Sequence, residues 1–394
     1  MPRLWRAALA IAITLAVWVT TPVTTANGGF DSDAAFYARL VDAPLFSAPP
    51  EVPPPYVYRV LTPRLVSWLP GPLLARFRTV ALVADIATLA LLFELFAAFD
   101  VGAAAAVFGV LLYAGVFWTL KFSFFSPGYV DHVTGLLLVG FVYLTARRRY
   151  VLATLVLAVS ALQKESLPLF GVFLAADIVA TSGNRLTLRQ LLGVAAALTV
   201  PIATVLLVHL AVGVPGGGTV RNVLREGWRL LHPRFWPVFL QTTFSGLGLI
   251  PLALLSRRQE CWAQCRRRPA LVVFLVIAAA FLLGGVDKGR LFQYALPVLA
   301  LLAAIAAESL AHELRGRFWI WAVVFLTAHF YLGNYLSPIG PRTVFLAKLV
   351  PEHVYAPAIV HLSRLYLARD CGIAVAVFLF TLWMVDRRPA PLQR

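Results

Sequence analysis

Charge and cysteine are the two features that this sequence has little of. Only 13% of its 394 residues are Asp, Glu, Lys or Arg, about half the fraction that soluble domains carry. It has three cysteines, too few for a disulfide framework. Cys261 and Cys265 form a lone C-x-x-x-C without the second pair that a structural zinc site needs. The scarcity of charge argues against a soluble globular domain, and the scarcity of cysteine argues against a fold held by disulfides.

Apolar residues make up 60% of the chain, and the mean hydropathy is +0.81. They gather in runs near 20 residues, which is the length that a helix needs to cross a hydrocarbon core of about 30 Å. We therefore predict an all-α polytopic membrane protein, a single domain over residues 1–394 with about twelve transmembrane helices. The expected spans lie near 7–24, 79–99, 103–120, 132–146, 150–163, 166–181, 190–213, 244–256, 270–284, 291–310, 318–335 and 371–385.

The first apolar run follows Arg3 and Arg6 and has the appearance of a signal peptide. It is longer than the usual apolar region of a signal peptide, so we expect a retained first helix. The runs at 150–163 and 244–256 are short for full spans, and tilted, kinked or re-entrant segments are the alternatives.

Basic residues predict the orientation of the bundle. Short connections carry clusters such as Arg147–Arg149 and Arg266–Arg268, and the positive-inside rule assigns such connections to the cytoplasm. Both termini are then cytoplasmic, in what we expect to be a bacterial inner (plasma) membrane. The outer loops are expected at 25–78, 214–243 and 336–370. The net charge is +16. We expect the basic residues to contact the anionic head groups of membrane lipids, and we expect no nucleic-acid partner.

Polar residues suited to chemistry fall on the predicted outer side. Ionisable groups at membrane depth are costly, so they line a cavity or pair with one another. We therefore predict a polar chamber of mixed charge near the outer surface. Its expected members are Asp31, Asp33, Tyr58, Arg59, Asp131, His132, Lys164, Glu165, Asp287 and Arg290.

Asp31 and Asp33 stand in GGFDSDAAFYARL, directly after the first span. Two carboxylates separated by one residue can share a divalent cation such as Mg²⁺ or Mn²⁺, or one can act as a base while the other tunes it. The structural alternative is a helix N-cap, because a carboxylate favours the positive end of the helix dipole.

Asp287 and Arg290 connect two strongly apolar spans. An arginine at the outer mouth of a helix can hold a phosphate bidentately. An ordinary Asp–Arg pair at a short turn, with snorkelling side chains, is the alternative.

Two adjacent pairs complete the predicted chamber. Lys164 and Glu165 stand in a hydrophobic hairpin, where they either contact a polar substrate or form its solvated tip. Asp131 precedes His132, which is either a proton carrier or a solvent-facing residue after a capping aspartate.

In the long outer segment 214–243, Arg221, Arg225 and Arg229 recur at helical spacing among tryptophans, which predicts an amphipathic helix in the head-group plane.

The chain resembles the GT-C type glycosyltransferases in these motifs. A first helix leads directly into an acidic D-x-D-like element at Asp31–Asp33. A Y-R-V-L-x-P stretch follows at Tyr58–Pro63, a K-E pair at Lys164–Glu165 and a late D-x-x-R at Asp287–Arg290. The resemblance implies a polytopic helical enzyme that moves a sugar from a polyprenyl-phosphate carrier to an acceptor glycan, lipid or protein at the outer membrane face.

The resemblance also implies roles for individual residues. Asp31 or Asp33 would be the base that deprotonates the acceptor hydroxyl, and Arg290 would hold the carrier phosphate as it leaves with inversion at the sugar. The remaining members of the chamber would bind substrate. Some GT-C enzymes use a divalent metal, which Asp31 and Asp33 would permit. The sequence ends at DRRPAPLQR without the soluble domain of larger GT-C enzymes, so acceptor recognition is expected from the outer loops.

Two other functions are compatible with the same residues. A transporter or flippase for a lipid-linked or anionic solute would use them as a pathway, but such proteins often show inverted repeats, and no repeat is apparent here. A non-catalytic membrane scaffold would tolerate substitution of Asp31, Asp33 or Arg290 as long as it folds.

Overall fold

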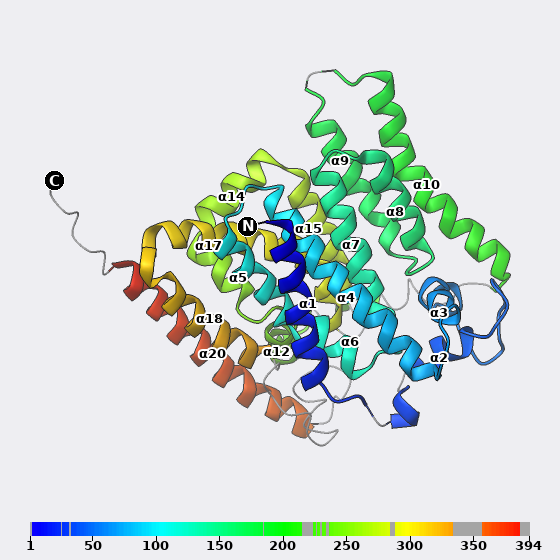
Figure 1. Cartoon of the computed structure of the whole chain (residues 1–394), viewed down its shortest axis with the longest axis horizontal. Coiled ribbons are helices and arrows are strands. Elements are labelled where there is room, and N and C mark those ends of the chain that lie inside the picture. Colours follow the sequence, from blue (N-terminus) through cyan, green and yellow to red (C-terminus); the bar gives the residue numbers. More distant parts are fainter. Residues whose placement is uncertain are drawn as a thin grey trace.

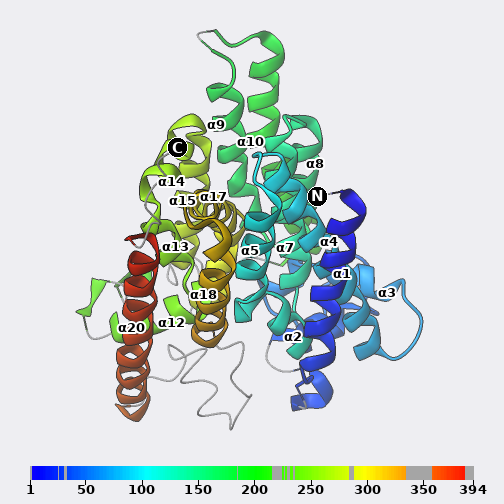
Figure 2. The same ribbon diagram turned by 60° about the vertical axis from the view of Figure 1, so that its left-hand side comes forward.

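The computed structural model describes residues 2–24, 26–30, 33–183, 185–214, 224–225, 227–228, 231–233, 236–283, 288–333 and 357–386. Every regular element within these residues is a helix, and the helices pack side by side as an elongated bundle (Figures 1 and 2). The prediction of an all-α fold is confirmed.

Five segments are long and apolar enough to cross a bilayer, which supports a membrane protein. They are α1 (Arg3–Thr20), α4 (Leu73–Ala97), α10 (Leu188–Val212), the run Leu296–Leu332 that holds α17 (Leu296–Leu314), η8 (Arg315–Arg317) and α18 (Phe318–Leu332), and the Leu367–Asp386 part of α20 (Pro357–Asp386). A sixth is broken: α5 (Ala103–Ala114) meets η3 (Phe117–Lys121) and α6 (Phe122–Phe125) at a bend of 52°.

The predicted number of about twelve transmembrane helices is not confirmed. Most of the other expected spans are helical but short, and at 1.5 Å per residue a helix of 10–17 residues covers only about 15–25 Å. These helices are α7 (Asp131–Ala146), α8 (Tyr150–Ala161), η4 (Leu167–Phe170) with α9 (Gly171–Ala180), and α15 (Ala270–Ala280) with η6 (Phe281–Leu283). The expected span at 244–256 is divided between α12 (Trp236–Leu247) and α13 (Ile250–Ser256), and α14 (Arg258–Arg267) follows.

The inner helices are buried in protein, whereas the outer ones present apolar side chains to their surroundings. On α17 most side chains are buried, from Leu296 to Leu314. On α10, Leu206, Leu207 and Leu210 are 59%, 65% and 78% exposed. Helices that are apolar on their exposed faces suit a lipid environment.

The two ends of the bundle differ in character. At one end lie the turn Arg147–Arg149 that follows α7, and Arg315 and Arg317 after α17. The opposite end, called here the site end, holds the starts of α7 and α17 and the end of α10. Short helices gather at the site end. Figure 1 shows α2 (Asp33–Leu40) and α3 (Leu61–Ser67) there. The others are η1 (Ala26–Gly29), η2 (Tyr56–Tyr58), α16 (Lys288–Leu291) and η7 (Phe292–Tyr294).

Some expected site residues and loops lie outside the described residues. These are Asp31, Asp287, most of the outer loop 336–370, and Arg221 and Arg229 of the predicted amphipathic helix.

Candidate functional site

Segments that are distant in the sequence bring charged residues together at the site end. Asp33 is the first residue of α2, Asp131 is the first residue of α7, and Arg290 lies in α16. Lys164 follows α8 in the turn before η4. We call Asp33, Asp131, Lys164 and Arg290 the acid–base cluster.

Arg290 bridges the two carboxylates of the cluster. Its Nη1 donates to Asp33 Oδ2 at 3.2 Å, and its Nε lies 3.3 Å from Asp131 Oδ2. Its guanidinium also lies 4.9 Å from the centre of the Tyr129 ring, a cation–π distance. With 9% of its surface exposed, the arginine is held on three sides.

Asp131 is the hub of the cluster. Its Oδ1 accepts hydrogen bonds from Lys164 Nζ at 2.6 Å and from Gln293 Nε2 at 2.5 Å. Lys164 is 3% exposed, so the interpretation of this residue as a solvated hairpin tip is wrong. Burial alone would lower the pKa of Lys164, but the neighbouring Asp131 carboxylate and Tyr294 together outweigh burial and raise it. The lysine is therefore an ammonium ion held inside the protein.

Arg59 and Glu165 form a second, adjacent ion pair. Arg59 Nε donates to Glu165 Oε2 at 3.1 Å and Nη2 donates to Oε1 at 2.9 Å, while Nη1 donates to the Tyr37 hydroxyl at 2.9 Å. Burial opposes ionisation of Glu165, yet the bidentate arginine keeps its pKa below the usual range. The pair fastens η2 to the turn before η4.

Tyr56 connects the second pair to the cluster. Its hydroxyl donates to Asp33 Oδ1 at 2.9 Å, so both oxygens of Asp33 have a donor. Burial and the nearby Asp33 carboxylate raise the pKa of Tyr56, which keeps the hydroxyl protonated as a donor. Asp33 is thereby held in one orientation.

His132 is buried beside the cluster without a partner. It is 3% exposed, and neither ring nitrogen has a hydrogen-bond partner among the described residues. The interpretation of His132 as a solvent-facing residue is therefore wrong. A buried imidazole without a partner is costly to the fold, and its nitrogens are free to bond a group that enters the site.

Tyr58 takes a structural position instead of joining the cluster. Its hydroxyl donates to the Val214 carbonyl at 2.6 Å, and its ring stacks on His209 with centroids 3.8 Å apart. Tyr58 therefore fastens η2 to the end of α10. The resemblance implied a substrate contact here, and the geometry gives the side chain a packing role.

Several polar residues in and around the cluster were not predicted from the sequence. Gln293 follows Arg290 by one helical turn, and Tyr56 stands two positions before Tyr58 in the motif PYVYR. Gln163 is fully buried, and its Nε2 donates to Thr62 Oγ1 at 2.8 Å and to the Val130 carbonyl at 2.5 Å. The only sign of Gln293 in the sequence was its position three residues, about one helical turn, after the predicted site residue Arg290.

A metal site is not formed by the described carboxylates. The guanidinium of Arg290 already occupies the space between Asp33 and Asp131. Among the described residues, no group of three or more His, Cys, Asp or Glu side chains is placed to bind a metal ion. Asp31, the other expected ligand, lies outside the described residues.

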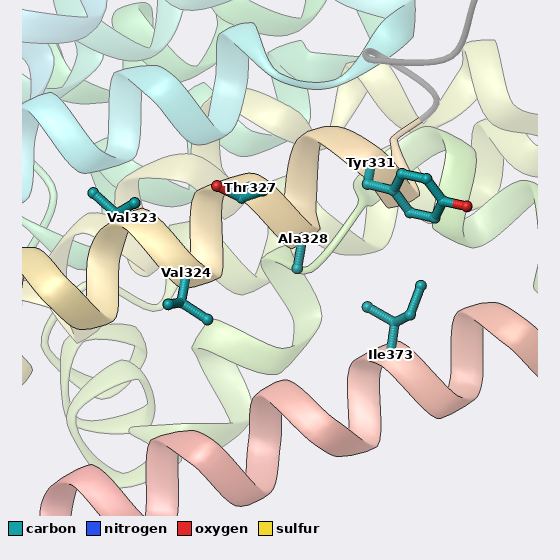
Figure 3. Close-up of a pocket in the computed structure, with 6 residues that line it drawn as sticks. All are labelled: Val323, Val324, Thr327, Ala328, Tyr331 and Ile373. Atoms are coloured by element: carbon teal, nitrogen blue, oxygen red, sulfur yellow. The ribbon is translucent and has the colours of Figure 1, made fainter.

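An open cavity of about 400 Å³ lies elsewhere, between α18 and α20. Figure 3 shows Val324 and Ala328 of α18 facing Ile373 of α20 across it, with Val323, Thr327 and Tyr331 completing the lining. None of these side chains is charged, so the cavity does not suit a sugar phosphate. The polar chemistry of the chain lies in the acid–base cluster.

Models of known protein families and the sequences of curated proteins were compared with the chain, and neither comparison found a match. A functional assignment therefore depends on the cluster and its chemistry.

Proposed function

We propose that the chain is a membrane-embedded glycosyltransferase that transfers a sugar from a polyprenyl-phosphate carrier to an acceptor hydroxyl. The observation that carries the proposal is the position of Arg290 between Asp33 and Asp131, at 3.2 and 3.3 Å. A glycosyl phosphate needs a cation for its leaving group and a carboxylate for its acceptor. In the acid–base cluster, Arg290 would be that cation and Asp33 that carboxylate, and the two side chains are in contact.

Binding of the donor would rearrange these ion pairs. The carrier phosphate is an anion that competes with Asp33 for the Arg290 guanidinium, which binds phosphate oxygens bidentately. Asp131 keeps its bonds to Lys164 and Gln293, so it stays in place. Donor binding would therefore release Asp33 from Arg290, while Tyr56 keeps its hydrogen bond to Asp33 Oδ1.

The transfer step follows from this arrangement. Asp33 takes the proton of the acceptor hydroxyl while the acceptor oxygen forms a bond to the anomeric carbon of the sugar. The bond from that carbon to the phosphate oxygen breaks, and the electron pair leaves with the polyprenyl phosphate. Arg290 stabilises the charge that develops on the phosphate. One displacement of this kind inverts the anomeric centre.

The proposed topology gives the site access to a lipid-linked donor. The basic turns lie at the end of the bundle opposite to the cluster, and the positive-inside rule would assign them to the cytoplasm. The cluster then faces outward from the plasma membrane, with both termini inside. In this proposal the short helices α7, α8, α9 and α15 complete the set of about twelve membrane segments as tilted or paired spans.

Sugar transfer by the purified protein in liposomes tests the proposal. Polyprenyl-phosphate hexoses and pentoses would be supplied with membrane glycolipid and peptide acceptors, and release of free polyprenyl phosphate would be measured. We expect release with one donor class. Movement of intact donor across the bilayer without release would instead indicate a flippase and overturn the proposal.

A further inference from the structure

Helix α14 (Arg258–Arg267) presents a cationic stripe at the end of the bundle opposite to the acid–base cluster. Arg258, Trp262 and Arg266 follow one another at intervals of four residues and so share one helix face. All three are exposed, and Trp262 is 57% exposed. Arginine on either side of an exposed tryptophan is an unusual arrangement for a surface that meets only water.

The opposite face of α14 is fixed to the bundle. Cys261 and Cys265 are each 8% exposed, and Cys261 Sγ lies 3.6 Å from the Leu302 carbonyl of α17. On the flank, Ser309 donates to Glu260 at 3.0 Å, and the preceding Arg257 pairs with Glu313. The helix therefore lies on α17 with its cationic face turned away from the protein.

The surroundings of α14 indicate what covers that face. The exposed Arg267 adjoins the stripe, and α15 begins at Ala270, only three residues after α14 ends. Because α15 is wholly apolar and its Val276 is 63% exposed, α14 lies where hydrocarbon gives way to head groups. Tryptophan prefers this depth, and arginine there meets lipid phosphates.

We propose that the outer face of α14 binds the phosphate groups of an anionic phospholipid surface. Arg258 and Arg266 pair with the phosphates, and Trp262 inserts its ring between them at the head-group level. Lipid binding then holds α14 against α17 and shields Cys261 and Cys265, which lie on the face of α14 that packs on the bundle. This inference concerns the end opposite to the acid–base cluster and is independent of the proposed enzymatic function.

The buried cysteines provide the measurement. The chain has three cysteines, and Cys371 is exposed. The substitution Cys371→Ser therefore leaves only the thiols of Cys261 and Cys265, on the buried face of α14. Full-length protein would be placed in nanodiscs of pure phosphatidylcholine or of phosphatidylcholine with phosphatidylglycerol, and the rate of maleimide labelling would be followed. We expect labelling to be roughly 25-fold slower in the anionic discs, because Arg258 and Arg266 at such a surface each contribute a factor of about five.

Three double variants in the same Cys371→Ser background show whether the two arginines cause the difference. Arg258→Gln with Arg266→Gln should abolish the difference between the two lipids, while Arg258→Lys with Arg266→Lys should keep it. Arg148→Gln with Arg149→Gln removes two exposed charges from another turn at the same end and should keep it as well. Equal labelling of the parent protein in both lipids would overturn the inference, as would an equal loss of protection in the Arg148/Arg149 variant.

Discussion

Arg290 Nη1 lies 3.2 Å from Asp33 Oδ2, although the two residues are 257 positions apart in the sequence. The contact neutralises a cation and a carboxylate that have separate tasks in the proposed reaction. An incoming phosphate is the group that can separate them, because it replaces one anionic partner of the arginine with another. The base would then become available only when the donor is bound.

Arg290→Ala should lower sugar transfer by about two to three orders of magnitude, the loss typical of removing a donor that stabilises developing charge. Arg290→Lys should have an intermediate rate, because lysine keeps the charge but cannot bridge two groups bidentately. Release of polyprenyl phosphate measures both variants, with gel filtration as the control for folding. A near wild-type rate for Arg290→Ala would contradict the assigned role.

Asp131 and Lys164 should be strongly coupled in stability. Both are buried and lie 2.6 Å apart, so removing either one leaves a charge in the interior, at a cost of about 3–5 kcal/mol. The double variant Asp131→Asn with Lys164→Met should lose less than the sum of the single variants. Unfolding in detergent gives the four free energies, and additive losses would show that the pair does not interact.

Two buried histidines, His132 and His329, should respond in opposite ways to replacement by leucine. Both ring nitrogens of His329 are bonded, to the Leu249 amide at 3.0 Å and to the Leu112 carbonyl at 2.8 Å, so His329→Leu should destabilise the fold by about 2 kcal/mol. His132 has no such partners, so His132→Leu should leave the unfolding temperature unchanged or raise it. If His132 bonds the substrate, that variant should also raise KM. Equal destabilisation by both substitutions would contradict this contrast.

Stability should fall at acid pH through Glu165. Its pKa is depressed in the folded protein, so its contribution is complete above the ordinary glutamate pKa of about 4.3. As the pH falls below that value the unfolded chain takes up the proton first, and the contribution is lost. The unfolding temperature should therefore fall less between pH 5 and pH 3 for Glu165→Gln than for wild type. Glu51→Gln, at an exposed position, serves as the control and should retain the wild-type slope; identical slopes for all three proteins would contradict the prediction.

Much of the helical fold could be predicted from apolar runs, because a helix that lies in lipid must satisfy its own backbone hydrogen bonds. The lengths of the individual helices could not be predicted as well. The expected span at 103–120 breaks between Ala114 and Phe117, where Gly115 follows the last residue of α5 and interrupts the apolar pattern. Short helices such as α8 depend on tertiary packing against their neighbours, which hydropathy does not encode.

The members of the cluster could be predicted because charge is scarce in an apolar chain, so that each ionisable residue stands out. Their pairing could not. Local sequence suggested a solvated turn for Lys164, whereas its side chain is buried and binds Asp131, which also lies beside Arg290. Such contacts join helices that are distant in the sequence, and only the packing of those helices decides which charges meet.

Asp33 is the proposed base of the sugar transfer, and the transfer rate of Asp33→Asn tests this role. Asp42→Asn is the matched control, because Asp42 is an exposed aspartate that follows the same short helix. Both variants would be assayed in liposomes beside the wild type for release of polyprenyl phosphate. We predict that Asp33→Asn folds but loses transfer, while Asp42→Asn keeps the wild-type rate. Undiminished transfer by a folded Asp33→Asn protein would contradict it.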